Sequence, residues 1–87
     1  MDKIIYKGMT DEKISKSAIY SHYYARDVLK GRFELGEKAI SMSARYSYYY
    51  ARDILKGRFE LGEKAIFDIG DDKFASMYLL ILIQKLY

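Results

Sequence analysis

Apolar residues recur at helical spacing in two long segments of the chain. In the second segment they fall at i, i+4, i+7 and i+11, on one face of a helix: Ala44, Tyr48, Ala51 and Leu55. A second stripe runs beside the first: Tyr46, Tyr50 and Ile54. The earlier segment carries the same two stripes: Ala18, His22, Ala25 and Leu29, with Tyr20, Tyr24 and Val28. Two adjoining apolar stripes predict helices that are covered on both flanks, as in a stacked array.

The first long helix is expected over Thr10–Lys30, because Thr10 can cap its start and two acidic residues follow in the first turn. The second is expected from about Ser43 to Lys56. Gly31 and Gly57 follow these segments. We expect each glycine to take the left-handed conformation that often ends a helix.

Two short segments, Phe33–Ile40 and Phe59–Ile66, are expected to form two-turn helices. Gly36 lowers the helix propensity of the first by about 1 kcal/mol relative to alanine. We therefore expect this glycine to let a neighbouring helix approach closely, or the segment to be partly 3₁₀.

The last segment, Asp71–Tyr87, predicts a helix opened by two aspartates. Residues 78–83 within it are apolar without a break. A helix that is apolar all round is either buried on most sides or used in self-association, so a homodimer through this helix is one expected mode of association. A strand is the competing interpretation, and we disfavour it because the flanks fit a helix and no partner strand is evident.

A near-identical unit occurs twice in succession. When the sequence is shifted by 26 residues, Ile14–Ile40 lies on Ile40–Ile66. The two copies differ only at these pairs of positions: Lys16/Met42, Ile19/Arg45, His22/Tyr48 and Val28/Ile54. A fixed period of this length is typical of repeat architectures, whose terminal units differ from the inner ones because they face water. The differing positions mark the side of the long helix where the two units meet different surroundings.

Together these patterns predict an all-α fold, namely a short right-handed helical-repeat solenoid of alternating long and short helices with a C-terminal capping helix. We divide the single domain, 1–87, into four parts: a degenerate N-terminal cap (1–13), repeat 1 (14–39), repeat 2 (40–66) and the capping helix (67–87). A chain of 87 residues has little interior, so we expect modest stability. The absence of proline suits an almost wholly helical chain.

Composition argues against several classes of protein. The chain has no cysteine, so it has neither a disulfide nor a thiolate metal site. Its start does not match a secretory signal, and its longest apolar run, Met77–Ile83, is far shorter than the ~20 residues that span a bilayer. We expect a cytoplasmic protein with no membrane partner. The net charge of +3 arises from 15 basic and 12 acidic residues that are interleaved, which is weak support for nucleic-acid binding.

The stretch Tyr24–Glu37 and its copy Tyr50–Glu63 resemble the tandem helical repeats of uncharacterised tailed-phage proteins, whose core has the form Tyr-Ala-x-Asp-Val-x-x-Gly-Arg-aromatic-x-x-Gly-Glu. Those repeats often carry tryptophan where this chain has Phe33 and Phe59, and proline at the next position. The resemblance covers roughly Ile14–Ile66. It implies a helical solenoid of phage or prophage origin in the cytoplasm of a bacterial host. It carries over no catalytic residue.

His22 is the only histidine of the chain. A catalytic histidine needs a nucleophile or an orienting acid beside it. The counterpart of His22 in the second copy is Tyr48, which indicates that the position accepts any half-buried aromatic ring. We therefore expect His22 to have a packing role.

Acidic residues occur in pairs at matching positions of the two copies: Asp27, Glu34 and Glu37, and Asp53, Glu60 and Glu63. Such carboxylates could bind a cation or act as acid and base. Arginine or lysine accompanies each of them, however. We favour ion pairs between successive units, formed by Asp27 or Glu37 with Arg52 or Arg58. No enzymatic activity, metal or other cofactor is expected.

The Lys-Gly-Arg triplets, 30–32 and 56–58, raise the question of phosphate binding at one end of the stack. Helix C-termini repel anions, and cations belong there because they offset the helix dipole. The Gly-rich turn into a helix N-terminus, which phosphate cradles use, is also missing. We therefore give phosphate binding the smaller weight.

The tyrosine-rich stretches, 20–24 and 46–50, carry more rings than one helix face can hold. Tyr23 and Tyr49 fall off the two apolar stripes and are expected to be partly exposed. Exposed tyrosines beside arginines are common in protein interfaces. The alternative, with equal weight, is that these two rings pack on the short helix of the next unit.

The leading functional hypothesis is non-enzymatic binding to a host or phage protein. Short phage proteins often disable host defences, so by analogy alone we extend it to inhibition of a component such as CRISPR–Cas. The expected partner-binding residues are Tyr23, Arg26, Arg32, Arg45, Tyr49, Arg52 and Arg58. Nucleic-acid binding through four of these arginines and the tyrosines is the alternative: Arg26, Arg32, Arg52 and Arg58.

Overall fold

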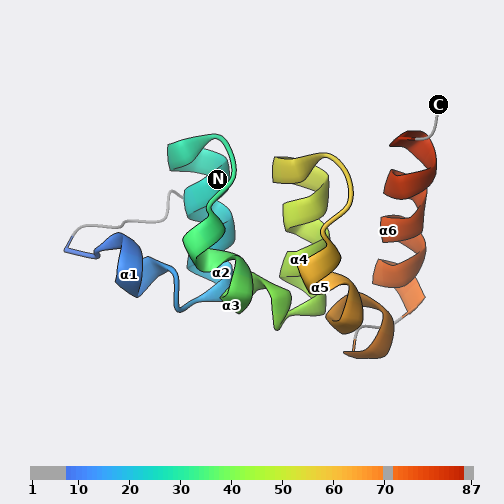
Figure 1. Ribbon diagram of the computed structural model, residues 1–87, viewed down its shortest axis with the longest axis horizontal. Coiled ribbons are helices and arrows are strands. Elements are labelled where there is room, and N and C mark those ends of the chain that lie inside the picture. The colour runs from blue at the N-terminus through green and yellow to red at the C-terminus, as the bar shows by residue number, and fades with distance from the viewer. Residues whose placement is uncertain (1–7, 70–71, 86–87) are drawn as a thin grey trace.

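The computed structural model describes residues 8–69 and 72–85 of the chain (Figure 1). All regular secondary structure in these residues is helical, so the prediction of an all-α chain is confirmed for them. The elements in chain order are α1 (Asp11–Ile14), α2 (Ala18–Tyr23), η1 (Tyr24–Leu29), η2 (Glu34–Gly36), α3 (Glu37–Ser41), α4 (Ala44–Tyr50), η3 (Ala51–Leu55), α5 (Glu60–Lys64), η4 (Ala65–Ile69) and α6 (Asp72–Lys85).

The long helices lie side by side along the longest axis of the molecule (Figure 1). The first two are continuous pairs, in which α2 runs into the π-helical turn η1 and α4 runs into η3. The third is α6. Helix α4 contacts both α2 and α6, so it is covered on both flanks as its two apolar stripes predicted. The extents of 40 × 26 × 24 Å fit such a row of helices.

The prediction of one helix over Thr10–Lys30 is wrong, because the segment is broken between α1 and α2. Thr10 caps only the four-residue helix α1, where its hydroxyl accepts the Lys13 N–H. Ser15 then bonds back to the Glu12 carbonyl, and Ser17 starts α2 by accepting the Tyr20 N–H. Serine side chains that bond to the nearby backbone compete with a continuous helix and favour caps. Ser43 caps α4 in the same way.

The left-handed residue at the end of each long helix is a lysine, not the glycine that the sequence predicted. Lys30 has φ 53° and Lys56 has φ 52°, whereas neither Gly31 nor Gly57 is among the residues with positive φ. The cause is the wide last turn, in which the N–H groups of Lys30 and Gly31 both bond to the Ala25 carbonyl. This turn places the reversal one residue earlier. A left-handed conformation costs a residue with a side chain about 1 kcal/mol.

The short segments differ in detail between the two copies. The first begins as the 3₁₀ turn η2 and continues as α3, so the expectation of a partly 3₁₀ segment is confirmed there. The second is the α-helix α5, which runs into the π-helical turn η4. The core contains matching residues from these segments and their neighbours: Ile14, Phe33, Ile40, Phe59 and Ile66.

Helix α6 is buried on one side only. Tyr78 is completely buried, while Leu79, Leu80 and Ile83 are each about half exposed. The alternative of a strand in this segment is wrong. The exposed leucines provide the apolar surface that a dimer through α6 would need, and the dimer itself stays a prediction. Two of its other predicted features, the opening at Asp71 and the cap residues 1–7, lie outside the described residues. None of the described helices is both long enough and apolar enough to cross a membrane.

Gly36 allows a close helix contact, as the sequence predicted. A Cβ atom at this position would lie 2.6 Å from the Ser21 Cβ on α2, and at Gly62 it would lie 2.6 Å from the Ser47 Cβ on α4. Neither serine can move away easily, because its hydroxyl donates 2.9 Å bonds to a buried carbonyl, from Ser21 to Ile14 and from Ser47 to Ile40. The two glycines therefore set the distance between short and long helices.

We expect Gly36→Ala to lower the free energy of unfolding by about 3 kcal/mol, because overpacking forces the short helix away from α2. Gly31→Ala is the matched control. Its Cβ would meet only the Leu29 carbonyl oxygen at 3.8 Å, and φ at Gly31 is not positive. Urea denaturation of both variants measures the difference, and equal stability of the two would contradict the close-contact explanation.

Candidate functional site

A buried hydroxyl group joins the first short segment to the next long helix. Tyr50 Oη on α4 donates to Glu37 Oε2 at 2.7 Å and accepts the Phe33 N–H at 2.9 Å. Arg32 holds the same carboxylate through two bonds of 2.6 and 3.1 Å. We call this arrangement the tyrosine link. Because Tyr50 is completely buried, the link fixes the loop and the short helix against α4.

The tyrosine link recurs at the next junction. Tyr78 Oη on α6 donates to Glu63 and accepts the Phe59 N–H at 2.9 Å, and Arg58 pairs with Glu63 at 2.7 and 3.1 Å. Tyr50 and Tyr78 are 78 − 50 = 28 residues apart, so two additional residues precede α6 relative to the repeat. The C-terminal segment thus drops the sequence motif but keeps this one buried tyrosine.

A reduced form of the link occurs at the first junction. Tyr24 Oη donates to Asp11 Oδ1 at 2.8 Å. Asp11 precedes Glu37 by 37 − 11 = 26 residues, so it occupies the corresponding position although it is shorter by one methylene group. Asp11 is exposed to solvent, whereas Glu37 is buried. The first junction is therefore the more solvated one.

The links shift the pKa values of their members in opposite directions. Burial of the Glu37 carboxylate opposes its ionisation, but the hydrogen bonds from Arg32 and Tyr50 outweigh this effect and hold its pKa below the ordinary value. For Glu63 the hydrogen bond from Arg58 is the largest effect, and the pKa is again lowered. Burial and the bond to Glu37 raise the pKa of Tyr50. At neutral pH each link therefore pairs an ionised carboxylate with a neutral phenol.

The predicted ion pairs between successive units are wrong. Each arginine pairs within its own unit: Arg26 with Asp27 at 2.8 Å, Arg32 with Glu37 at 2.6 Å, Arg52 with Asp53 at 2.7 Å, and Arg58 with Glu63 at 2.7 Å. The physical reason is proximity, since the partners are one or five residues apart and form bidentate pairs locally. Contact between units is made by tyrosine and histidine donors instead.

His22 bridges the first two units. It is buried to 1% exposure, and its Nε2 lies 3.2 Å from Asp53 Oδ2 on the next long helix. Its Nδ1 is buried without a hydrogen-bond partner. Burial lowers the pKa of His22 and outweighs the opposite effect of Asp53, so the ring is neutral at pH 7. The packing role that the sequence predicted is consistent with this burial, and the contact with Asp53 was not foreseen.

The rings of Tyr23 and Tyr49 belong to an aromatic cluster between the long helices. His22 packs against Tyr23, Tyr46 and Tyr49 with centroid distances of 4.9, 5.7 and 5.8 Å. Tyr49 also lies 6.4 Å from Phe74 on α6. Both tyrosines are half-buried, and they pack on a neighbouring long helix rather than on a short one. Little of either ring remains for a partner.

The arginines among the predicted binding residues fall into two groups. Arg26, Arg32, Arg52 and Arg58 lie at or just beyond the C-terminal ends of the first two long helices. Arg45 is exposed near the start of α4, away from them. The structure therefore gathers four of the seven predicted residues at one edge of the molecule. It leaves apart Arg45, Tyr23 and Tyr49.

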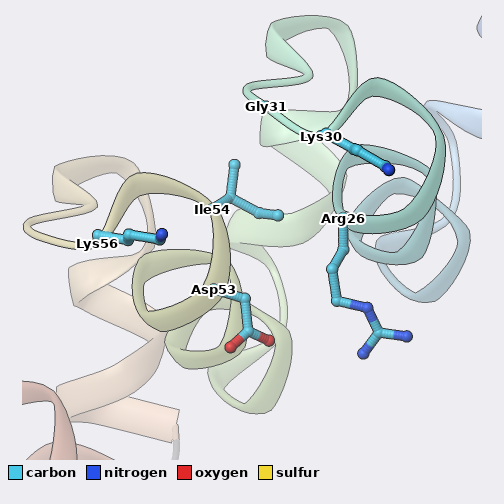
Figure 2. Close-up of a pocket in the computed structure, with 6 residues that line it drawn as sticks. All are labelled: Arg26, Lys30, Gly31, Asp53, Ile54 and Lys56. Atoms are coloured by element: carbon cyan, nitrogen blue, oxygen red, sulfur yellow. The ribbon is translucent and has the colours of Figure 1, made fainter.

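Two grooves and one pocket lie along this edge. The first groove, about 430 Å³, lies between η1 and η3 and is lined by Arg26, Lys30, Gly31, Asp53, Ile54 and Lys56 (Figure 2). The second groove, about 330 Å³, lies between η3 and α6 and is lined by Arg52, Lys56, Ile81 and Gln84. The loop pocket, about 450 Å³, is lined by Arg32, Glu37, Leu55, Arg58, Phe59, Glu60 and Leu61.

The two lysines of these grooves were linked in the sequence only to phosphate binding, and they are absent from the predicted binding residues. The signal that could have identified them is the repeat itself. A shift of 26 residues carries Arg26 and Lys30 of the first groove onto Arg52 and Lys56 of the second. Repeated residues at one helix end must line repeated grooves when the helices lie side by side.

Comparison with known proteins adds no assignment. No protein-family model matches the chain, and no curated protein or solved structure matches it. The resemblance to phage repeats stays an expectation. The functional argument therefore rests on the residues of the grooves, the loop pocket and the tyrosine links.

We expect Tyr50→Phe to lower the free energy of unfolding by about 1–3 kcal/mol, because the buried Phe33 N–H loses its partner and Glu37 loses a donor. Tyr49→Phe is the matched control on the same helix, since the Tyr49 hydroxyl forms no hydrogen bond with a described residue and its ring contacts are kept. Chemical denaturation compares the two. A loss that is no greater for Tyr50→Phe than for Tyr49→Phe would show that the link contributes only its ring.

We expect the stability of the fold to fall as the pH drops below about 6.5, the ordinary pKa of histidine. The pKa of His22 is lowered in the folded state, so the unfolded chain takes up a proton first and becomes favoured. Lowered pKa values of Asp53, Glu37 and Glu63 add a further loss at more acidic pH. His22→Gln should flatten the profile between pH 7.5 and 5 only. Urea midpoints across this range test it, and an unchanged slope in the variant would exclude His22 as the cause.

Proposed function

We propose that the chain is a non-enzymatic protein-binding module, built as a short right-handed helical-repeat solenoid. The recurrence of the tyrosine link, the glycine contacts and the left-handed lysines at corresponding positions supports a repeat architecture. In such architectures neighbouring units share one core and present repeated side chains along an extended surface. Partner binding is the common use of that surface.

The observation that carries the proposal is a pair of exposed leucines beside exposed arginines at the loop edge. Leu35 is 60% exposed and Leu61 is 57% exposed. Arg32 and Arg58 follow the same spacing, and their side chains are 56% and 60% exposed while they remain paired with glutamate. We call these four residues the loop-edge surface. Large apolar side chains next to arginine are typical of the centre of protein interfaces.

The more specific part of the proposal is a phage-encoded inhibitor of a host defence protein such as a CRISPR–Cas component. It is supported by the resemblance of Tyr24–Glu37 and its copy to phage repeats, and by the small size of the chain. It remains an analogy of origin rather than of site.

Nucleic-acid binding is the second candidate function, and the basic grooves favour it. Arg26, Lys30, Arg52 and Lys56 lie along one edge, where they could contact successive phosphates. The tyrosines do not support it, because Tyr23 and Tyr49 pack between the long helices instead of offering faces for base stacking. Protein binding therefore remains the preferred function.

Affinity capture with surface variants tests the proposal. The immobilised chain is exposed to nuclease-treated lysate of the bacterium that carries it, and bound proteins are identified by mass spectrometry. We expect a protein that the native chain retains and that Leu35→Ser/Leu61→Ser loses. Both leucines are exposed, so the double change should alter stability by no more than about 0.5 kcal/mol per site.

Met42→Ser is the control, because Met42 is 75% exposed and does not line the loop pocket. This variant should retain the captured protein. Recovery of nucleic acid alone from untreated lysate would contradict protein binding and support the second candidate. Equal capture by both variants would place the binding surface elsewhere and remove the loop edge from the proposal.

A further inference from the structure

The two grooves are the same feature at successive junctions. In the first groove Arg26 and Lys30 come from one long helix, and Asp53, Ile54 and Lys56 come from its neighbour (Figure 2). In the second groove Arg52 and Lys56 take the places of Arg26 and Lys30. Lys56 lines both grooves, so they adjoin along the edge of the helix row. Together they offer one extended site.

The charge of this site is positive and only partly balanced. The acids that belong to it are already engaged, because Asp27 pairs with Arg26, and Asp53 accepts bonds from Arg52 and His22. Lys30 and Lys56 form no ion pair with any described residue. Their ammonium groups, on long flexible stems, are therefore the charges that remain for a ligand.

The backbone provides a second, independent observation. Lys30 and Lys56 both adopt the left-handed conformation, although a glycine is the next residue in each copy. Residues with side chains are uncommon in this region, and such outliers are concentrated at functional sites. A lysine held there in both copies indicates that the side chain is needed at this place.

The floor of the grooves is apolar. Ile54 projects from η3 toward η1 in the first groove (Figure 2), and Ile81 lines the second. Both isoleucines are half-buried and pack against the core, so they form a fixed surface. Cations above aliphatic side chains match a ligand that combines carboxylates with apolar groups. They match a nucleic acid poorly, since no aromatic ring lines either groove for base stacking.

We propose that the two grooves bind an acidic, amphipathic segment of a partner protein. Its carboxylates pair with Lys30 and Lys56, and its apolar side chains rest on Ile54 and Ile81. This inference rests on the proposed protein-binding function and names the chemistry of the partner. Charge complementarity at a groove with an apolar floor gives both the rate and the selectivity of such docking.

Fluorescence anisotropy with defined probes tests the proposal. The first probe is a labelled peptide of alternating glutamate and leucine, and the second is an oligothymidylate of equal charge. We expect the native chain to bind the peptide more tightly, and Lys30→Glu/Lys56→Glu to weaken peptide binding about tenfold. Lys38→Glu/Lys64→Glu is the control with the same change of charge, because both lysines are exposed on α3 and α5 outside the grooves. It should change affinity less than about threefold.

A second variant guards against loss of folding. Lys30→Gly/Lys56→Gly removes both ammonium groups and suits the left-handed backbone, so it should remain folded and still lose peptide binding. Equal weakening by the groove and control variants would overturn the proposal, because bulk charge would then explain binding. Tighter, groove-dependent binding of the oligothymidylate would overturn it in favour of nucleic acid.

The lysate experiment separates this inference from the proposed function. Capture of a partner by Lys30→Glu/Lys56→Glu as efficiently as by the native chain would overturn the groove assignment and leave protein binding intact. Groove-dependent peptide binding without any captured protein would contradict the proposed function and leave the groove chemistry standing.

Discussion

The buried hydroxyl of Tyr50 is the contact on which the arrangement of the helices depends. It satisfies two groups that have no other means of pairing in the interior: the Phe33 N–H and one oxygen of Glu37. Burial of either group without a partner would cost more than an ordinary hydrogen bond contributes. Because the donor and the acceptors lie on different elements, the loop, the short helix and the next long helix can only be placed together. Tyr78 does the same for α6.

The link also explains why the arginines are fixed between the copies. Arg32 and Arg58 do not bridge the units themselves, but they keep Glu37 and Glu63 ionised and correctly oriented for the tyrosine of the next helix. An arginine can hold both oxygens of a carboxylate at once, which a lysine cannot. The remaining donors of each guanidinium face solvent at the loop edge. One residue therefore serves the junction with one side and is available to a partner with the other.

Periodicity predicted what depends on local sequence, and it missed what depends on contacts between elements. The apolar stripes located the long helices, and Gly36 indicated close packing because a missing side chain is visible in the sequence. The break at Ser15–Ser17 was missed because a continuous 3.6-residue pattern outweighed the serine caps. The pairing of Glu37 with Tyr50 spans 13 residues, and no local pattern distinguishes that tyrosine from its neighbours. For the same reason four arginines of the site were found and the two lysines were not.

The places where the copies differ make the two junctions chemically unequal. At the first junction His22 meets Asp53, and at the second the same positions hold Tyr48, which packs on Phe74, and Ile81. The buried acid of the first junction is thus exchanged for an apolar side chain at the second. The change reaches the edge, because Asp53 lines the first groove and Ile81 lines the second. A ligand that spans both grooves would meet more polar surface at one end and more apolar surface at the other, and this difference would determine its direction.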